Sequence, residues 1–227
     1  MTITPIAHFR SAFPSKFGIP RQSGIVEELR GSIVFEPTYR KADALRGLEG
    51  FSHIWLIWEF SANRTKREWQ PTVRPPRLGG NEHMGVFATR SPFRPNALGL
   101  SCVEVESIEF TSDCGPVINV KGADLMDGTP IYDVKPYLPF TDSHPEARGG
   151  FADDVKDYAL EVVFPEEWLQ MIPADKREGL FGILAQDPRP SYQRKPDRVY
   201  GLTFAGFDIR FTVMDDVLTV VEVNETA

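Results

Sequence analysis

Cysteine is scarce in this chain of 227 residues, which contains only Cys102 and Cys114. Both lie outside any CxxC pattern, so the sequence argues against a disulfide framework and against a structural zinc site. The four histidines are scattered along the chain at His8, His53, His83 and His144. Because metal sites draw their ligands from characteristic short spacings, we expect no metal site.

Long apolar runs are also missing. The longest run, residues 54–58, falls far short of the roughly 20 residues that a membrane span requires. Arg10 interrupts the only segment that resembles the core of a signal peptide. We therefore expect an unsecreted, cytoplasmic protein without a membrane partner, and the low cysteine content agrees with a reducing compartment.

The motifs of several large enzyme classes are absent. The sequence contains no GxGxxG, GxxxxGK(S/T), GxSxG or HExxH segment. These motifs mark dinucleotide-binding, phosphate-binding, hydrolase and zinc-protease sites. A doubly wound nucleotide-binding fold is therefore not expected.

Proline and glycine, with 19 and 18 residues, interrupt the first 140 positions at short intervals. This spacing leaves room for short strands rather than long helices. The expected strands are residues 3–9, 32–35, 53–60, 83–88, 100–110, 117–122 and 131–135. Short strands separated by turn residues predict a β-barrel or a β-sandwich for this part.

The pattern changes after residue 140, where an acidic, glycine-containing segment (141–154) reads as a linker. We therefore divide the chain into domains at residues 1–140 and 141–227. The second part alternates a strand at 158–164, a short helix opened by Pro165, a helix at 174–186, and strands at 199–207, 209–213 and 217–223. The predicted fold is mainly β, with an N-terminal barrel and a smaller C-terminal α+β domain.

The charge of the chain is unevenly distributed. The formal net charge is −7, but residues 142–167 hold eight acids against two cations, which accounts for most of it. Residues 64–94 hold seven cations, six of them Arg, against two acids. A locally positive surface on an acidic protein is therefore expected.

The strand at 53–60 is apolar on both faces, with Ile54, Leu56 and Trp58 on one and Trp55 and Ile57 on the other. Two interpretations are open. The strand is either central and covered on both sides, or its second face meets a partner subunit.

Two proline-containing loops carry arginines. In residues 89–96, prolines stiffen a loop that presents Arg90 and Arg94, whose guanidinium groups suit carboxylate or phosphate oxygens. Residues 186–195 form a second basic loop that includes Tyr192. Cations for phosphate and an aromatic ring for base stacking are the groups that bind single-stranded RNA. The alternative is that these are solvated loop cations.

Asp133 and Lys135 belong to one predicted strand, and a period of two places them on the same face. At about 3.3 Å per residue they lie some 6 to 7 Å apart along the strand. Such a pair either acts on one substrate or forms a surface ion pair.

Several segments occur together in a recognisable order. They are KFGIPRQ (16–22), LRGLEGFSHIW (45–55), RPPRLGG (74–80), GVFATRSPFRPN (85–96), and DGTP (127–130) followed by KPYLP (135–139). Together they resemble the TrmO family of tRNA methyltransferases, also called YaeB or TsaA-like. The segment LAQDPRPSY (184–192) extends the resemblance into the C-terminal part.

The resemblance implies a homodimeric enzyme that depends on S-adenosyl-L-methionine and binds it in a single β-barrel rather than in a Rossmann sheet. The implied cofactor-binding residues are Pro20, Arg21, Gln22, Ser61, Ala62, Arg90, Leu100, Lys121, Gly122, Ala123, Asp124 and Leu125. Many relatives have His-Gln where this chain has Ser61-Ala62, so backbone contacts are expected there.

The implied reaction is methylation of N6 of threonylcarbamoyl-adenosine next to the tRNA anticodon. That nitrogen is a poor nucleophile, because its lone pair is shared with the purine and the carbamoyl carbonyl. We hypothesise that Asp133 removes or orients the N–H proton and that Lys135 stabilises charge on the carbamoyl oxygen or binds the threonine carboxylate. Tyr137 and His53 are weaker candidates.

Contacts to the tRNA backbone are expected from cations of the arginine-bearing loops. They are Arg74, Arg77, Arg94, Arg189, Arg194 and Lys195. Two other functions stay open at this stage. One is a non-catalytic RNA-binding or regulatory barrel that senses S-adenosylmethionine, and the other is a methyltransferase acting on a small molecule.

Overall fold

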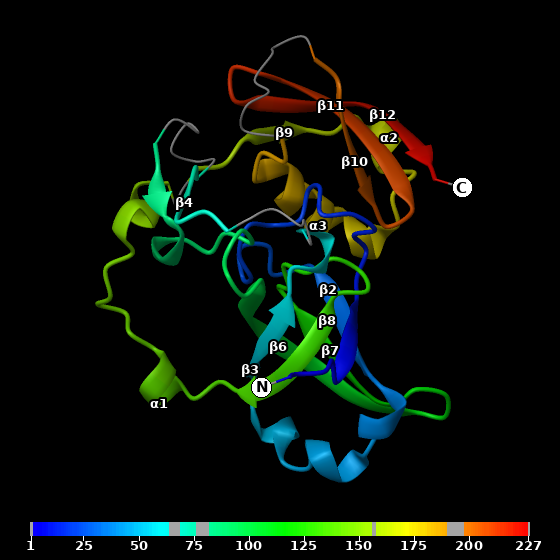
Figure 1. Ribbon diagram of the computed structural model, residues 1–227. Coiled ribbons are helices and arrows are strands. Elements are labelled where there is room, and N and C mark those ends of the chain that lie inside the picture. The colour runs from blue at the N-terminus through cyan, green and yellow to red at the C-terminus, as the bar shows by residue number, and fades with distance from the viewer. Residues whose placement is uncertain (1, 64–68, 76–81, 156–157, 190–197, 227) are drawn as a thin grey trace.

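The computed structural model describes residues 2–63, 69–75, 82–155, 158–189 and 198–226. Within these residues, six strands close into an antiparallel barrel in the order β1-β2-β7-β6-β3-β8 (Figure 1). The barrel strands are β1 (Ala7–Arg10), β2 (Arg30–Phe35), β3 (His53–Glu59), β6 (Leu98–Thr111), β7 (Gly115–Lys121) and β8 (Pro130–Pro136). The expected N-terminal barrel is confirmed.

Alternation along β3 builds the barrel core. Ile54, Leu56 and Trp58 point inward and are buried, whereas Trp55 and Ile57 lie on the outer face. The inward residues pack with apolar side chains of the other barrel strands. These include Ala7, Phe9, Ile33, Phe35, Val103, Ile118, Val120 and Ile131. The burial of this set supplies the main favourable free energy of the barrel.

Short helices connect the strands. The 3₁₀ helices are η1 (Pro37–Tyr39), η2 (Ala42–Leu45), η3 (Leu48–Gly50), η4 (Ser61–Asn63), η6 (Val86–Ala88) and η7 (Gly150–Val155), and the helix α1 (Pro139–Asp142) follows β8. The strand expected at 83–88 is wrong in its second half. Only β5 (Met84–Gly85) pairs, with β4 (Thr72–Val73), and η6 follows because the Thr89 N–H and hydroxyl both donate to the Val86 carbonyl.

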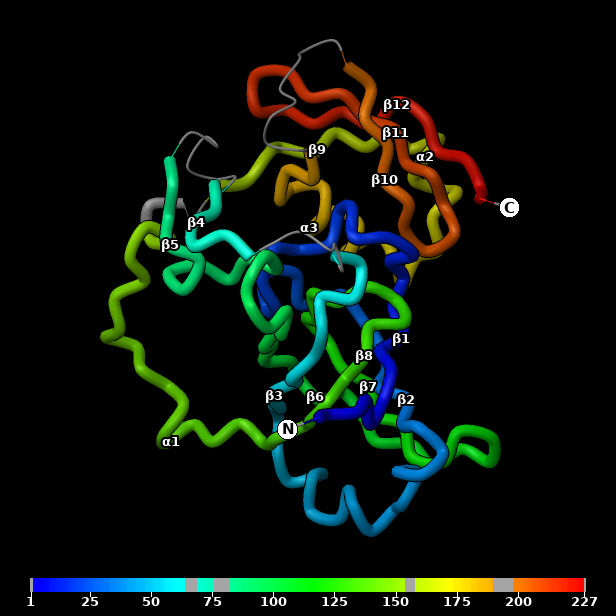
Figure 2. The backbone as a smooth tube through the Cα atoms, viewed as in Figure 1, coloured from blue at the N-terminus to red at the C-terminus, as the bar shows by residue number. Residues whose placement is uncertain are grey.

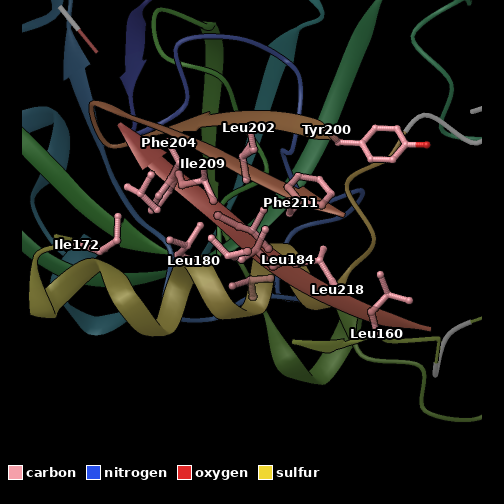
Figure 3. Close-up of a cluster of buried hydrophobic side chains, with 14 of the residues drawn as sticks. Leu160, Ile172, Leu180, Leu184, Tyr200, Leu202, Phe204, Ile209, Phe211 and Leu218 are labelled. Carbon is pink, nitrogen blue, oxygen red and sulfur yellow. The ribbon is translucent and has the colours of Figure 1, made fainter. Parts of the chain in front are cut away.

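The C-terminal part is a sheet covered by a helix. Its strands β9 (Glu161–Val163), β10 (Tyr200–Phe204), β11 (Phe207–Met214) and β12 (Val217–Glu225) are ordered β10-β11-β12-β9, with β9 parallel to β12. The helices are α2 (Glu166–Leu169) and α3 (Ala174–Ala185). Figure 3 shows Leu180 and Leu184 of α3 facing Leu202 and Phe211 of the sheet.

The loop between β1 and β2 links the two parts. Phe13, Val26 and Leu29 of this loop are buried in the same cluster as the C-terminal core. Helix α3 lies close to the loop, since a Cβ added to Gly182 would stand 2.5 Å from a methyl group of Val26. The division at residue 140 stays a prediction, but an N-terminal segment contributes to the C-terminal core.

Among the described residues, no helix is long and apolar enough to cross a membrane. No group of three or more His, Cys, Asp or Glu side chains within these residues is placed to hold a metal ion. The expectations of a cytoplasmic protein and of a metal-free site stay predictions.

Candidate functional site

One end of the barrel collects most of the residues to which the sequence assigned a cofactor. Because neighbouring strands are antiparallel, β1, β3 and β7 finish, and β2, β6 and β8 begin, at the same end. We call this the site end; in Figure 1 it faces the C-terminal sheet. The loops that leave it include residues 11–29, 60–97 and 122–129.

Two of these loops meet through Gln22 and Arg90. A guanidinium N–H of Arg90 donates to the side-chain carbonyl of Gln22, 68 residues away in the sequence. The Gln22 amide in turn donates to the carbonyl of Arg21. The two polar side chains therefore lie together on the surface, and Arg90 keeps further N–H donors for an anion.

A third loop joins them through backbone hydrogen bonds. The Gly24 N–H donates to the Gly122 carbonyl, and the Gly122 N–H donates to the Leu29 carbonyl, both over 2.8 Å. Gly122 has a φ of +71°, and a Cβ there would stand 3.4 Å from the Gly24 nitrogen. The close approach of the loops and the left-handed backbone both favour glycine at this position.

Asp124 ends a buried chain of hydrogen bonds. The Trp58 indole N–H donates to the Ser101 hydroxyl over 2.9 Å, and that hydroxyl donates to a carboxylate oxygen of Asp124 over 2.6 Å. Burial raises the pKa of Asp124, although Ser101, the charge of Arg90 and the Ser23 N–H partly oppose the shift. The chain orients a carboxylate that is held beside Arg90 and the loop at Ser23.

Comparison with known proteins identifies the architecture around this cluster. The family model of the N-terminal domain of tRNA-methyltransferase O matches residues 8–143, and that of the TrmO C-terminal domain matches residues 157–226. A crystal structure of TrmO from Pseudomonas aeruginosa superimposes with a TM-score of 0.78 and 34% identity, covering 99% of this chain and 97% of that chain. The chain belongs to the TrmO family.

Relatives of known name agree. The tRNA (adenine(37)-N6)-methyltransferase of Escherichia coli K12 is 42% identical over 218 residues, which are 92% of either chain. The Pseudomonas aeruginosa PAO1 protein RcsF, which is described as a candidate S-adenosylmethionine-dependent methyltransferase, is 38% identical over 218 residues, or 92% of this chain and 91% of its own. The human tRNA (adenine(37)-N6)-methyltransferase is 37% identical over 155 residues, 66% of this chain but 33% of its own length.

The other residues implied by the TrmO resemblance differ in solvent exposure. Ser61 and Ala62 form η4, which is held near the start of β6 by the hydrogen bond from the Phe60 N–H to the Ala97 carbonyl. Ala123 and Leu125 are buried in the barrel core, and the Leu125 carbonyl accepts a hydrogen bond from the Ser11 hydroxyl over 3.0 Å. A separate group is more open: Leu100 is 55% exposed on β6, and Lys121 forms an ion pair of 3.3 Å with Glu104.

Asp133 and Lys135 lie on one face, as the period of two predicts. Their side chains form an ion pair of 3.0 Å on the outer face of the barrel. Asp133 stands opposite Ile57 of β3, which in turn stands opposite Leu100 of β6. Asp133 therefore belongs to a row of outer side chains that leads across the sheet, through Ile57, to Leu100 of the implied cofactor site, and Lys135 lies in the next row, opposite Trp55.

The outer face is partly covered at the next row. The indole N–H of Trp55 and the N–H of Leu138 each donate to Asp142 over 3.0 Å. These two bonds, the Leu138 bond first, lower the pKa of Asp142. The Tyr137 ring lies 5.8 Å from that of Trp55 and 6.1 Å from that of His53.

The cations assigned to RNA have different surroundings. Arg74 donates to a ring nitrogen of His83 over 3.0 Å and is exposed, and Arg94 donates to the Thr89 carbonyl over 3.0 Å. Arg77, Arg194 and Lys195 lie outside the described residues.

Arg189 is paired with an acid of its own loop. Its guanidinium donates to both carboxylate oxygens of Asp187, over 2.7 and 2.9 Å, and its side chain is only 9% exposed. Tyr158 donates to the same carboxylate over 3.1 Å. The phosphate contact expected of Arg189 stays a prediction, and in this structure its guanidinium is engaged by Asp187.

Sequence reasoning missed Ser101 and treated Trp58 only as a core residue. The sequence gives little indication of their hydrogen bond, because the two residues are 43 positions apart and a serine in an apolar strand is common. The one clue is that Ser101 follows Leu100, which the resemblance had already assigned to the cofactor.

The buried pair predicts the behaviour of an Arg189→Ala variant. Burial raises the pKa of Asp187, but the hydrogen bonds and charge of Arg189, with the Tyr158 bond, outweigh burial and lower it below its ordinary value. Removing the guanidinium leaves a buried carboxylate without its cationic partner, with the Tyr158 hydroxyl as its remaining side-chain donor, and we expect a loss of about 3 to 5 kcal/mol in unfolding free energy. Urea denaturation at neutral pH measures it.

The same pair has a pH dependence that checks the assignment. A lowered folded-state pKa stabilises the protein above the unfolded pKa of Asp, and this contribution is lost as the pH falls through the folded value. Arg189→Ala should remove that part of the acid dependence. Wild-type stability in the variant would contradict a structural role for the pair and restore Arg189 as a surface cation.

Proposed function

We propose that this TrmO-family protein uses S-adenosyl-L-methionine to methylate N6 of threonylcarbamoyl-adenosine at position 37 of tRNA, in the cytoplasm. The polar cluster of Gln22, Arg90 and Asp124 at the site end carries the proposal. It coincides with the positions that the family resemblance assigns to the methyl donor. The identity of 42% to a tRNA (adenine(37)-N6)-methyltransferase over nearly the whole chain supports the substrate class.

The residues at the site end fit the donor's chemistry. Arg90 has guanidinium N–H groups for a carboxylate, Asp124 provides a carboxylate for a cation, and the exposed Leu100 provides an apolar surface for a flat base. When bound, S-adenosylmethionine supplies a methyl group on a sulfonium, which is a good leaving group without metal assistance.

Asp133 and Lys135 are proposed to act on the nucleoside. The carboxylate of Asp133 accepts the proton from N6, and the ammonium of Lys135 stabilises negative charge on the carbamoyl oxygen or binds the threonine carboxylate. The ion pair of 3.0 Å holds the two charged groups side by side, so both can reach one nucleoside. Alignment of the nitrogen with the methyl carbon provides the remaining acceleration.

A homodimer formed on the outer face of the barrel is part of the proposal. Leu98 of β6 is 36% exposed and Ile57 of β3 lies on the same outer face, so this face offers apolar side chains to a second copy beside the donor site at Leu100. Asp133 stands in the same row, so the interface would adjoin the nucleoside-binding pair. A sedimentation mass of one chain at micromolar concentration would contradict the dimer.

Methyl transfer is the direct test of the function. The purified full chain is incubated with isotope-labelled S-adenosylmethionine and tRNA that carries threonylcarbamoyl-adenosine, and the nucleosides are analysed by mass spectrometry. The label should appear on the threonylcarbamoyl-adenosine nucleoside. Donor binding without transfer would favour a sensor, and transfer to a small molecule in the absence of tRNA would favour the other alternative.

Donor binding should depend on pH through Asp124. Because the pKa of Asp124 is raised, its carboxylate is protonated at a higher pH than an ordinary aspartate. The cationic donor therefore binds with full affinity above the pKa of Asp124, and its affinity falls as the pH drops through that value. We expect Asp124→Asn to weaken binding about 10- to 100-fold at neutral pH and to abolish this pH dependence.

Calorimetric titration across the pH range measures both effects. Asp113→Asn is the matched control, because Asp113 is an exposed acid on the turn between β6 and β7, at the opposite end of the barrel. Unchanged affinity in Asp124→Asn would remove Asp124 from the donor site.

Replacement of Asp133 should separate chemistry from binding. Asp133→Asn keeps the shape of the side chain but removes the base, so we expect kcat to fall by about 10²- to 10⁴-fold. Donor affinity measured by calorimetry should stay at the wild-type value. A variant that methylates tRNA at the wild-type rate would exclude Asp133 as the base.

A further inference from the structure

Two aromatic side chains stack on the surface near the site end. Trp69 is 49% exposed and Phe87 is 73% exposed, and their ring centroids lie 6.3 Å apart with an angle of 30° between the planes. We call this pair the aromatic platform. Several ring pairs occur within the described residues, and in this pair both rings are exposed, whereas each other pair has at least one ring that is buried or half-buried.

The local fold holds the two rings together. Trp69 precedes β4 and Phe87 lies in η6, which follows β5. Strands β4 and β5 pair through Thr72 and Gly85, and the Val86 N–H donates to the Pro71 carbonyl over 2.9 Å. Figure 2 shows β4 and β5 at the left of the molecule, apart from the barrel strands.

Packing does not explain the platform. Neither ring belongs to the barrel core or to the C-terminal core. Large exposed aromatic surface is unfavourable in water, so two stacked rings on a short hairpin point to a flat binding partner.

The surrounding charge indicates what that partner is. Arg90 follows Phe87 by three residues, the Arg94 guanidinium donates to the carbonyl of Thr89, and Arg74 lies next to β4. In the described residues between 69 and 94, these three arginines are opposed by one acid, Glu82. Rings with arginines around them fit a single-stranded nucleic acid, which combines flat bases with phosphates.

We propose that the aromatic platform stacks an unpaired base of the tRNA anticodon loop while Arg74 and Arg94 contact the adjacent phosphates. The proposal rests on the proposed function and extends it, because it names residues that hold the RNA rather than the donor. Stacking is tolerant of base identity, so the platform places the loop without selecting its sequence.

The test compares tRNA affinity with donor affinity in variants of the full chain. Trp69→Ala and Phe87→Ala should each weaken binding of an anticodon stem-loop RNA about 5- to 150-fold, the range expected for loss of one stacked base. Affinity for S-adenosylmethionine should stay at the wild-type value. Trp69→Phe keeps a ring and should restore most of the RNA affinity.

Phe110→Ala is the control, because Phe110 is 65% exposed on β6 near the turn at the opposite end of the barrel. Three results would overturn the proposal. If Trp69→Ala and Phe87→Ala bind RNA as tightly as Phe110→Ala does, the rings have no role in RNA binding. If these variants lose donor affinity, the rings have a structural role, and if their oligomeric mass changes, the rings contact a protein partner. If the wild-type protein binds the RNA through the platform but transfers no methyl group, the proposed function is contradicted and the platform is not.

Discussion

Closure of the barrel by β1 is the constraint on which the rest of the structure depends. This short strand pairs with β2 on one side and with β8 on the other, and so turns the sheet into a barrel. Closure with antiparallel neighbours brings the ends of β3 and β7 and the starts of β6 and β8 to one place. Residues as distant in sequence as Gln22, Arg90 and Asp124 meet there, and the loop after β1 also fills the C-terminal core.

The site combines a rigid interior with an open rim. Trp58 and Ser101 are buried and hydrogen-bonded, so they fix Asp124 from inside the barrel. Arg90 and Gln22 lie on the exposed loops, where a ligand can compete for their hydrogen bonds. This division suits the proposed site, in which a small donor is held in a fixed pose and a tRNA is admitted beside it.

Local patterns predicted the parts of the fold that depend on neighbours in sequence. Alternation placed Ile54, Leu56 and Trp58 inside and put Asp133 and Lys135 on one face. The family resemblance supplied the proposed cofactor residues, which spacing alone did not give.

Contacts between distant or specially turned residues were not predictable. Arg189 reads as a loop cation, but Asp187 adopts a φ of +53° that brings its carboxylate onto the guanidinium two residues later. The stacking of Trp69 on Phe87 depends on the pairing of β4 with β5, which are too short to give a pattern.

The most direct measurement of the central claim is a crystal structure of the full chain with S-adenosylmethionine bound. We predict density for the donor at the site end, with its carboxylate at Arg90 and a cationic group at Asp124. Density for the donor anywhere else on the molecule, such as on the C-terminal sheet, would contradict the account.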